Sequence, residues 1–146
     1  MKSRILLLAI SMMFAVALQA QTYDQLWKRV QQMELKDLPK SVIVEAQAIY
    51  QKAKAEQNVP QMMKAYLTMM VYRKSISPDS LAVDVKGLEE WAASSQTEVQ
   101  DRAVLYSILG EITLENDFEK GNRYLHLSLK DVQHQKEPFY VLYAGY

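Results

Sequence analysis

Cysteine is absent from the chain, and histidine, glycine and proline are scarce, with 2, 4 and 4 residues among 146. A chain without cysteine has no disulfide, no thiolate metal site and no cysteine nucleophile. Two histidines cannot build a three-histidine zinc site. So few glycines and prolines argue against a loop-rich or all-β chain.

An excess of charge is also lacking, because 17 basic residues balance 17 acidic residues and no basic run occurs. A nucleic-acid-binding surface normally needs clustered positive charge, so nucleic acid is not expected as a partner. The length is that of one domain, or of one piece of a larger protein.

The first twenty residues differ from the rest of the chain. Lys2 and Arg4 precede an apolar stretch, and small Ala20 stands just before Gln21. This order is typical of a secretory signal peptide. The stretch is shorter than the about 20 apolar residues that span a membrane, although a retained anchor is the alternative interpretation. We therefore predict a signal peptide over 1–20, export to the periplasm or cell envelope, and no membrane span after cleavage. No cysteine follows the stretch, which excludes a lipid-anchored lipoprotein.

Residues 21–131 carry repeated helix-start signals. Thr22 with Gln25, and Thr97 with Gln100, match the capping-box pattern. Proline is favoured in the first turn of a helix. Apolar residues then recur at three- and four-residue steps. These signals predict six helices, with Gly121 interrupting the last; they begin near Thr22, Pro39, Pro60, Ser77-Pro78 (Ser77 as cap), Thr97 and Phe118.

The predicted fold class is all-α, with antiparallel helix pairs. The odd-numbered helices begin near Thr22, Pro60 and Thr97, close to the ~34-residue tetratricopeptide period. A short tetratricopeptide-like α-solenoid and an irregular helical bundle both fit this spacing. Gly110 lies among bulky residues, which predicts close approach of another helix. Residues 132–146 are expected to form a connector and an apolar tail of strand-like composition.

Residues that could carry chemistry are few. Glu111 and Glu115 could face His126, but the helical di-metal design needs further carboxylates and two Glu-x-x-His motifs. No phosphate-binding glycine loop or serine-nucleophile turn is present. The sequence therefore predicts no catalytic residue, no metal and no cofactor, and the chain is not expected to be an enzyme.

Aromatic side chains are the best candidates for an interaction surface. Tyr23, Trp27, Tyr66 and Tyr72 could line a surface that grips a peptide or a neighbouring domain. They could equally be spacers between helices, with their polar atoms at the rim. Four methionines could form an adaptable groove, but a core role is the more ordinary one for methionine at helical spacing; they are Met62, Met63, Met69 and Met70.

Several segments resemble the start of large exported bacterial alpha-2-macroglobulin-like proteins. They are YDQLWKRV at 23–30, KDLPKS at 36–41 and IYQKAKAE at 49–56, with weaker likeness in AVLYSIL at 103–109 and SLKD at 128–131. In that family a signal peptide precedes a Tyr-Asp-x-Leu-Trp opening, a Lys-Asp-Leu-Pro turn and a helix that ends in an Ala-Lys-rich segment.

The resemblance implies a longer parent protein with many β-sandwich domains, of the protease-trap or endopeptidase-inhibitor class. Thioester-bearing members trap proteases through a Cys-Gly-Glu-Gln segment, and this chain has no cysteine. No functional residue therefore carries over. We expect a non-catalytic N-terminal helical segment, a fragment or truncation of such a protein, whose partners are its following domains, a protease or a peptide. The alternative is a self-standing exported helical-repeat module that binds a protein.

Overall fold

The computed structural model describes residues 21–130, so the predicted signal peptide and the apolar tail lie outside the described residues. Within this part the secondary structure consists of six α-helices and contains no strand. The predicted all-α class is thereby confirmed. In the same residues no helix is long and apolar enough to cross a membrane.

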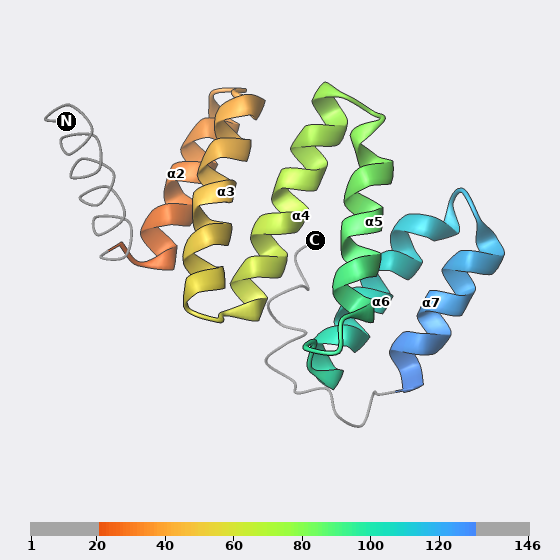
Figure 1. Ribbon diagram of the computed structural model, residues 1–146. Coiled ribbons are helices and arrows are strands. Elements are labelled where there is room, and N and C mark those ends of the chain that lie inside the picture. Colours follow the sequence, from red (N-terminus) through yellow and green to blue (C-terminus); the bar gives the residue numbers. More distant parts are fainter. Residues whose placement is uncertain (1–20, 131–146) are drawn as a thin grey trace, which may run out of the picture. The chain divides into compact units, whose positions relative to one another are not determined.

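The chain divides into two compact units between Ser77 and Pro78. Unit 1 contains α2 (Tyr23–Leu35), α3 (Pro39–Ala55) and α4 (Val59–Ile76), and unit 2 contains α5 (Ser80–Ala93), α6 (Val99–Leu114) and α7 (Phe118–Lys130). Within each unit, successive helices run antiparallel and pack against one another (Figure 1). The boundary falls inside the second predicted helix pair, while the first and third pairs each lie within one unit.

The predicted starts of the helices in unit 1 are confirmed. Thr22 closes the capping box, because its hydroxyl accepts from the Gln25 N–H at 3.3 Å and its own N–H donates to Gln25 Oε1 at 3.1 Å. Pro39 and Pro60 stand in the first turns of α3 and α4, where a missing N–H costs nothing. Asn58 adds a cap to α4 by accepting from the Gln61 N–H at 3.3 Å.

Two predicted caps in unit 2 are wrong. Ser77 ends α4, because its N–H donates to the Arg73 carbonyl at 2.8 Å, and α5 begins only at Ser80. The Thr97 hydroxyl donates to the Trp91 carbonyl at 2.6 Å and is therefore not the cap of α6. Glu98 takes the N-cap position, and its side chain makes no capping bond.

The two connections in unit 1 share one backbone feature, a residue in the left-handed conformation directly after the helix C-cap. Asp37 and Gln57, with φ of 53° and 54°, each directly follow a helix C-cap residue, Lys36 or Glu56. This left-handed backbone conformation ends a helix and reverses the chain, and it is usually taken by glycine or asparagine. Each reversal is followed within three residues by Pro39 or Pro60, so the next helix starts at once.

The core of unit 1 follows the predicted apolar spacing. Side chains of all three helices meet in one cluster that is almost fully buried; its members are Leu26, Val30, Val42, Ile49 and Ala65. Three of the four methionines of α4 are buried as well, at 1%, 2% and 6% exposure for Met63, Met69 and Met70. These three therefore belong to the core, as methionine at helical spacing usually does.

Glycine sets the distance between α6 and α7 in unit 2. A Cβ atom at Gly110 would lie 2.5 Å from Leu125 Cδ2, and one at Gly121 would lie 2.8 Å from the Leu114 Cα atom. The close approach predicted at Gly110 is thus confirmed. The interruption predicted at Gly121 is wrong, because α7 runs through this residue, which the contact with α6 keeps free of a side chain.

Candidate interaction surface

Two of the four predicted aromatic residues, Trp27 and Tyr72, bond across the seam between the first and third helices of unit 1, and Tyr23 of the first helix bonds beside it to Glu56, which follows the second helix. We call this seam the α2–α4 face and define it by the aromatic residues and their polar partners: Tyr23, Trp27, Glu34, Lys52, Glu56, Gln61, Lys64 and Tyr72. Tyr23, Trp27 and Tyr72 are half-buried and pack against the unit 1 core. Each ring therefore contacts the core of unit 1 and is partly exposed to solvent.

Trp27 occupies the middle of the α2–α4 face. Its indole Nε1–H donates to Gln61 Oε1 at 2.7 Å. The Lys64 ammonium lies 4.5 Å from the centre of the Trp27 ring, within the range of a cation–π interaction. Two residues of α4 thus fix both the edge and the face of the indole.

Tyr23 lies at one end of the face, in a cluster of charges. Its hydroxyl donates to Glu56 Oε2 at 2.6 Å, and the Lys52 ammonium donates to Glu56 Oε1 at 2.7 Å. Burial, and then the bond to Glu56, raises the pKa of Tyr23 well above its ordinary value. Lys52, and then Tyr23, lowers the pKa of Glu56. Over the physiological range the cluster therefore holds one paired cation, one paired anion and a neutral phenol.

Tyr72 lies at the other end of the face. Its hydroxyl donates to Glu34 Oε1 at 3.0 Å and so links α4 to α2. Burial raises the pKa of Tyr72, and the bond to Glu34 and the negative charge of Asp37 raise it further. The phenol stays protonated and keeps donating.

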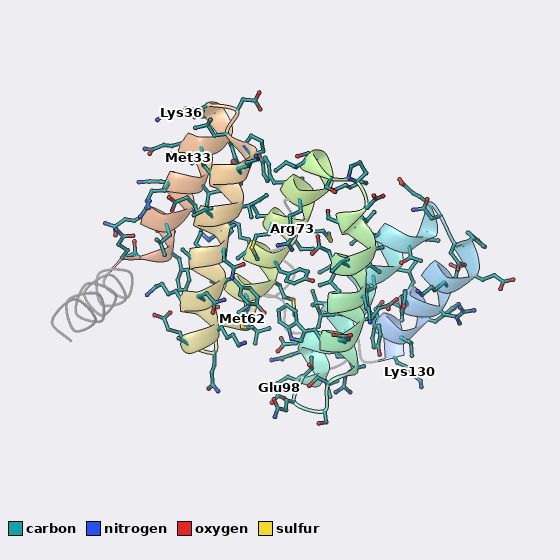
Figure 2. The ribbon with its side chains drawn as sticks, turned by 45° about the horizontal axis from the view of Figure 1, so that its top comes forward. Met33, Lys36, Met62, Arg73, Glu98 and Lys130 are labelled. Atoms are coloured by element: carbon teal, nitrogen blue, oxygen red, sulfur yellow. The ribbon has the colours of Figure 1, made fainter. Side chains whose placement is uncertain are left out.

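Tyr66 is not part of this face. It lies two residues beyond Lys64, roughly 200° around the same helix. Its ring centroid is 6.2 Å from that of Tyr50 on α3, and the guanidinium of Arg73 lies 5.8 Å from its centre. Figure 2 labels Arg73 near the C-terminal end of α4. The four predicted residues are therefore split between two sides of unit 1.

The polar partners of the aromatic rings were missed by reasoning from the sequence. Their spacing carried a signal, because Tyr23 and Glu56 are 33 residues apart, Trp27 and Gln61 are 34 apart, and Glu34 and Tyr72 are 38 apart. These separations match the helix-pair period seen in the sequence. A search for polar residues 33 to 38 positions away from each aromatic residue would have included these three partners.

Unit 2 contains a similar contact between its first and third helices. The Tyr124 hydroxyl donates to Glu89 Oε1 at 2.5 Å, and the Lys120 ammonium donates to the same atom at 2.8 Å. Lys120, and then Tyr124, lowers the pKa of Glu89. This cluster joins α5 to α7.

Asp101 is the most perturbed acid of unit 2. It stands in the first turn of α6 and is 4% exposed, and its Oδ1 atom has no hydrogen-bond partner. Burial raises the pKa of Asp101 to about 6, and the nearby Glu98 carboxylate adds to the rise. The neighbouring Arg102 does not pair with it, because its guanidinium donates to carbonyl oxygens at the end of α5 and in the α5–α6 connection.

Glu111, Glu115 and His126 are exposed, and residues 21–130 contain no group of three acidic or histidine side chains that could hold a metal ion. What the geometry does assemble is a half-buried aromatic face with paired charges. Such a face is suited to recognition.

Comparison with known proteins gives no match among family models, curated proteins or solved structures. The likeness to alpha-2-macroglobulin-like proteins therefore rests on the residues quoted above alone.

Proposed function

We propose that this chain is a non-catalytic helical segment of an exported protein, and that its α2–α4 face binds an extended segment of a protein partner. The observation that carries the proposal is the ordered row of half-buried aromatic rings, Tyr23, Trp27 and Tyr72, each fixed by a polar group of another element. Tryptophan and tyrosine supply most of the binding energy in many protein interfaces.

The charges of the face favour a protein partner over a strongly charged ligand. Lys52 is paired with Glu56, and Lys64 lies over the Trp27 ring. A polyanion would need unpaired cations, whereas a peptide can stack on the rings and bond to amide and carboxylate groups at the rim. Because the rings are already held in place, a partner loses little entropy in ordering them.

Selection of peptides that bind the chain tests this proposal. We would select from short random peptides displayed on phage and follow the indole N–H resonances of both tryptophans by NMR. Bound peptides should shift the Trp27 resonance and leave that of Trp91 unchanged. Trp27→Ala and Tyr72→Ala should each weaken binding at least about tenfold, which is the loss of a moderate interface anchor.

Tyr66→Ala is the matched control, since it removes an aromatic ring from another side of α4. It should leave binding within about twofold of the parent chain. Peptides whose binding is lost with Tyr66→Ala and kept with Trp27→Ala would refute the proposed face.

A parent of the alpha-2-macroglobulin-like class is the second proposal, and the positions of the resembling segments support it. Residues 23–30, 36–41 and 49–56 cover much of α2, the α2–α3 connection and α3, and they include the face residues Tyr23, Trp27 and Glu56. The bound segment would then belong to a following domain of the same polypeptide. Reading the gene beyond the codon for Tyr146 separates this proposal from a self-standing module, because only the parent predicts β-rich coding sequence there.

Export is part of both proposals and has a separate test. N-terminal sequencing of the protein from the periplasmic fraction should give Gln21, or a residue next to it, as the first residue. Recovery of intact Met1 on exported material would contradict cleavage.

A further inference from the structure

Two charges of opposite sign lie on the α2–α4 face. The Lys64 ammonium lies 4.5 Å from the centre of the Trp27 ring, which attracts a cation but carries no net charge. The Glu34 carboxylate accepts from the neutral Tyr72 hydroxyl at 3.0 Å. Within residues 21–130 neither Lys64 nor Glu34 forms an ion pair. Each charge is therefore positioned by an aromatic side chain that does not neutralise it.

The two charges are separated along the face. Glu34 follows Trp27 by seven residues, or two turns of α2, which places them about 10 Å apart along the helix axis. The helices α2 and α4 run in the same direction (Figure 1), and their contacts bring Lys64 level with Trp27 and Tyr72 level with Glu34. The face thus presents a positive charge at Trp27 and a negative charge about 10 Å further on.

Neighbouring charges keep the Tyr72 end of the face negative. Burial raises the pKa of Tyr72, and the bond to Glu34 and the charge of Asp37 raise it further, so both carboxylates act on this end. Lys36 stands between them in the chain and is exposed. Two acids against one base leave an excess of one negative charge among these three residues. A basic residue of a partner is therefore favoured at this end, and an acidic residue is disfavoured.

The separation of the charges favours one conformation of a bound peptide. In polyproline II conformation three residues span about 9 Å, and side chains three positions apart lie on the same side of the segment. In a β-strand, side chains three positions apart point to opposite sides. Segments in polyproline II conformation also dock on surfaces lined by aromatic side chains. A polyproline II segment can therefore pack on the rings and place two side chains at the two charges.

We propose that the α2–α4 face binds a peptide segment in polyproline II conformation that carries an acidic and a basic residue three positions apart. The acidic residue pairs with Lys64 beside Trp27, and the basic residue pairs with Glu34 beside Tyr72. This inference rests on the proposed function and names the chemistry of the bound segment. A single carboxylate needs only one cation, so the face can accept it although it is not suited to a polyanion.

Blocked peptides of the form Ac-Pro-X-Pro-Pro-Z-Pro-NH2 test the proposal on the full chain. The X and Z positions carry Glu and Lys, Lys and Glu, Glu twice, Lys twice or Gln twice. The prolines favour polyproline II, and the blocked ends carry no charge. Binding is followed at the indole N–H resonance of Trp27. At least one of the two mixed peptides should bind about fivefold more tightly than either like-charged peptide, in which one side chain meets its own charge.

Charge exchange on the protein gives the sharper test. Lys64→Glu should transfer the preference to the peptide with two lysines, and Glu34→Lys should transfer it to the peptide with two glutamates. A variant with a damaged fold would not gain affinity for a new peptide, so these gains report on charge recognition. Lys74→Glu is the matched control, because it makes the same change of charge roughly 200° around α4 from Tyr72. It should leave the order of affinities unchanged.

Three outcomes would overturn the inference. Equal affinities of all five peptides, with shifts at Trp27, would remove the charge preference and leave the proposed aromatic face standing. Unchanged preferences in both Lys64→Glu and Glu34→Lys would show that these two residues do not read the charges of the peptide. No shift at Trp27 with any of the peptides would exclude the polyproline II segment, and the peptides selected on phage then test the face separately.

Discussion

Unit 1 and unit 2 each consist of three antiparallel helices, with a tyrosine–glutamate hydrogen bond between the first and the third. They differ in the capping of their helices and in the pairing of their buried polar atoms. In unit 1 the starts of α2 and α4 are capped by side chains, those of Thr22 and Asn58, and the start of α3 is not. In unit 2 the starts of α5 and α6 have no side-chain cap, whereas α7 is capped by Asp117, whose Oδ1 accepts from the Lys120 N–H at 2.9 Å. All three buried side-chain polar atoms that lack a partner within residues 21–130 also belong to unit 2; they lie on Ser80, Asp101 and Thr113.

The comparison leads us to expect that helix packing alone does not set the stability of each unit. Both units bury apolar side chains at helical spacing, but unit 2 also carries the free-energy cost of unpaired polar groups, which is about 1–3 kcal/mol for each. We therefore expect unit 2 to unfold at lower denaturant than unit 1. Because each unit contains one tryptophan, Trp27 or Trp91, fluorine NMR of the chain labelled with 5-fluorotryptophan follows the two units separately.

The largest expected effect is that of Gly121→Ala. The new Cβ would lie 2.8 Å from the Cα and N atoms of Leu114, which are backbone atoms and cannot move alone. We expect unit 2 to lose about 2–3 kcal/mol of its free energy of unfolding, even though alanine favours a helix. The Trp91 transition should move and the Trp27 transition should not.

Gly110→Ala is the control for this prediction. Its closest contacts are Cδ2 and Cγ of the Leu125 side chain, which can change rotamer, so the loss should be smaller. Equal shifts of the Trp27 and Trp91 transitions in Gly121→Ala would show that the two units unfold as one. The two units would then have no separate stabilities to compare.

Asp101→Asn should give the next largest effect, and it should stabilise unit 2. The pKa of Asp101 is about 6 in the folded chain, against an ordinary value of 3.8, so the folded state favours the protonated acid. Its ionisation therefore costs nothing below about pH 4, an increasing amount between about pH 4 and 6, and the full amount above about pH 6. The asparagine should raise the free energy of unfolding by about 1–3 kcal/mol at pH 7.5, because one pKa unit is worth about 1.4 kcal/mol.

Measurements at two pH values test the sign of this effect. Urea unfolding followed at Trp91 should show a large gain for Asp101→Asn at pH 7.5 and almost none at pH 4. A gain that is the same at both pH values would mean that the charge of Asp101 is not its cause.

Capping substitutions should act in opposite directions in the two units. Thr22→Ala removes the capping box of α2 and should cost unit 1 about 1 kcal/mol. Glu98→Ser should give α6 a cap and stabilise unit 2 by up to about 1 kcal/mol, since Glu98 already has the extended backbone that a capping serine adopts, with φ −58° and ψ 150°. The midpoints of the Trp27 and Trp91 transitions measure the two effects. A loss of stability in Glu98→Ser would show that α6 is not limited by its missing cap.

The smallest effects should come from the tyrosine–glutamate bonds. Tyr72→Phe in unit 1 and Tyr124→Phe in unit 2 each remove one hydroxyl that donates to a carboxylate near the surface. Each should cost about 1 kcal/mol or less, as for an ordinary hydrogen bond. Similar losses of unfolding free energy in the two variants would show that this contact does not account for a difference in stability between the units. A loss above about 2 kcal/mol in either variant would contradict this.

The sequence predicted helices best where a residue acts within its own turn. Thr22, Pro39 and Pro60 affect only neighbouring backbone groups, and the structure has helices starting where they indicate. Thr97 carries the same local signal, but its hydroxyl donates to the Trp91 carbonyl six residues earlier, a choice that depends on how the α5–α6 connection folds. Gly121 likewise reads as a helix breaker until the contact with Leu114 is seen.

The candidate surface was predictable only in part, for the same reason. Aromatic residues draw notice by their type, so Tyr23, Trp27 and Tyr72 could be chosen from the sequence. Tyr66 has the same type but lies on another side of α4, and only the register of that helix against α3 reveals this. Gln61 and Lys64 are ordinary surface residues until the packing of α2 and α4 brings them to Trp27.

The long separation between partners on the α2–α4 face has a consequence for folding kinetics. Neighbouring helices joined by connections of a few residues can dock early, because little loop entropy is lost. The bonds from Trp27 to Gln61 and from Tyr72 to Glu34 close chain segments of 34 and 38 residues, so we expect them to form after both helix hairpins have docked. Contacts made after the transition state slow unfolding without speeding folding. A partner bound across this seam would therefore prolong the lifetime of the folded unit and leave its rate of formation unchanged.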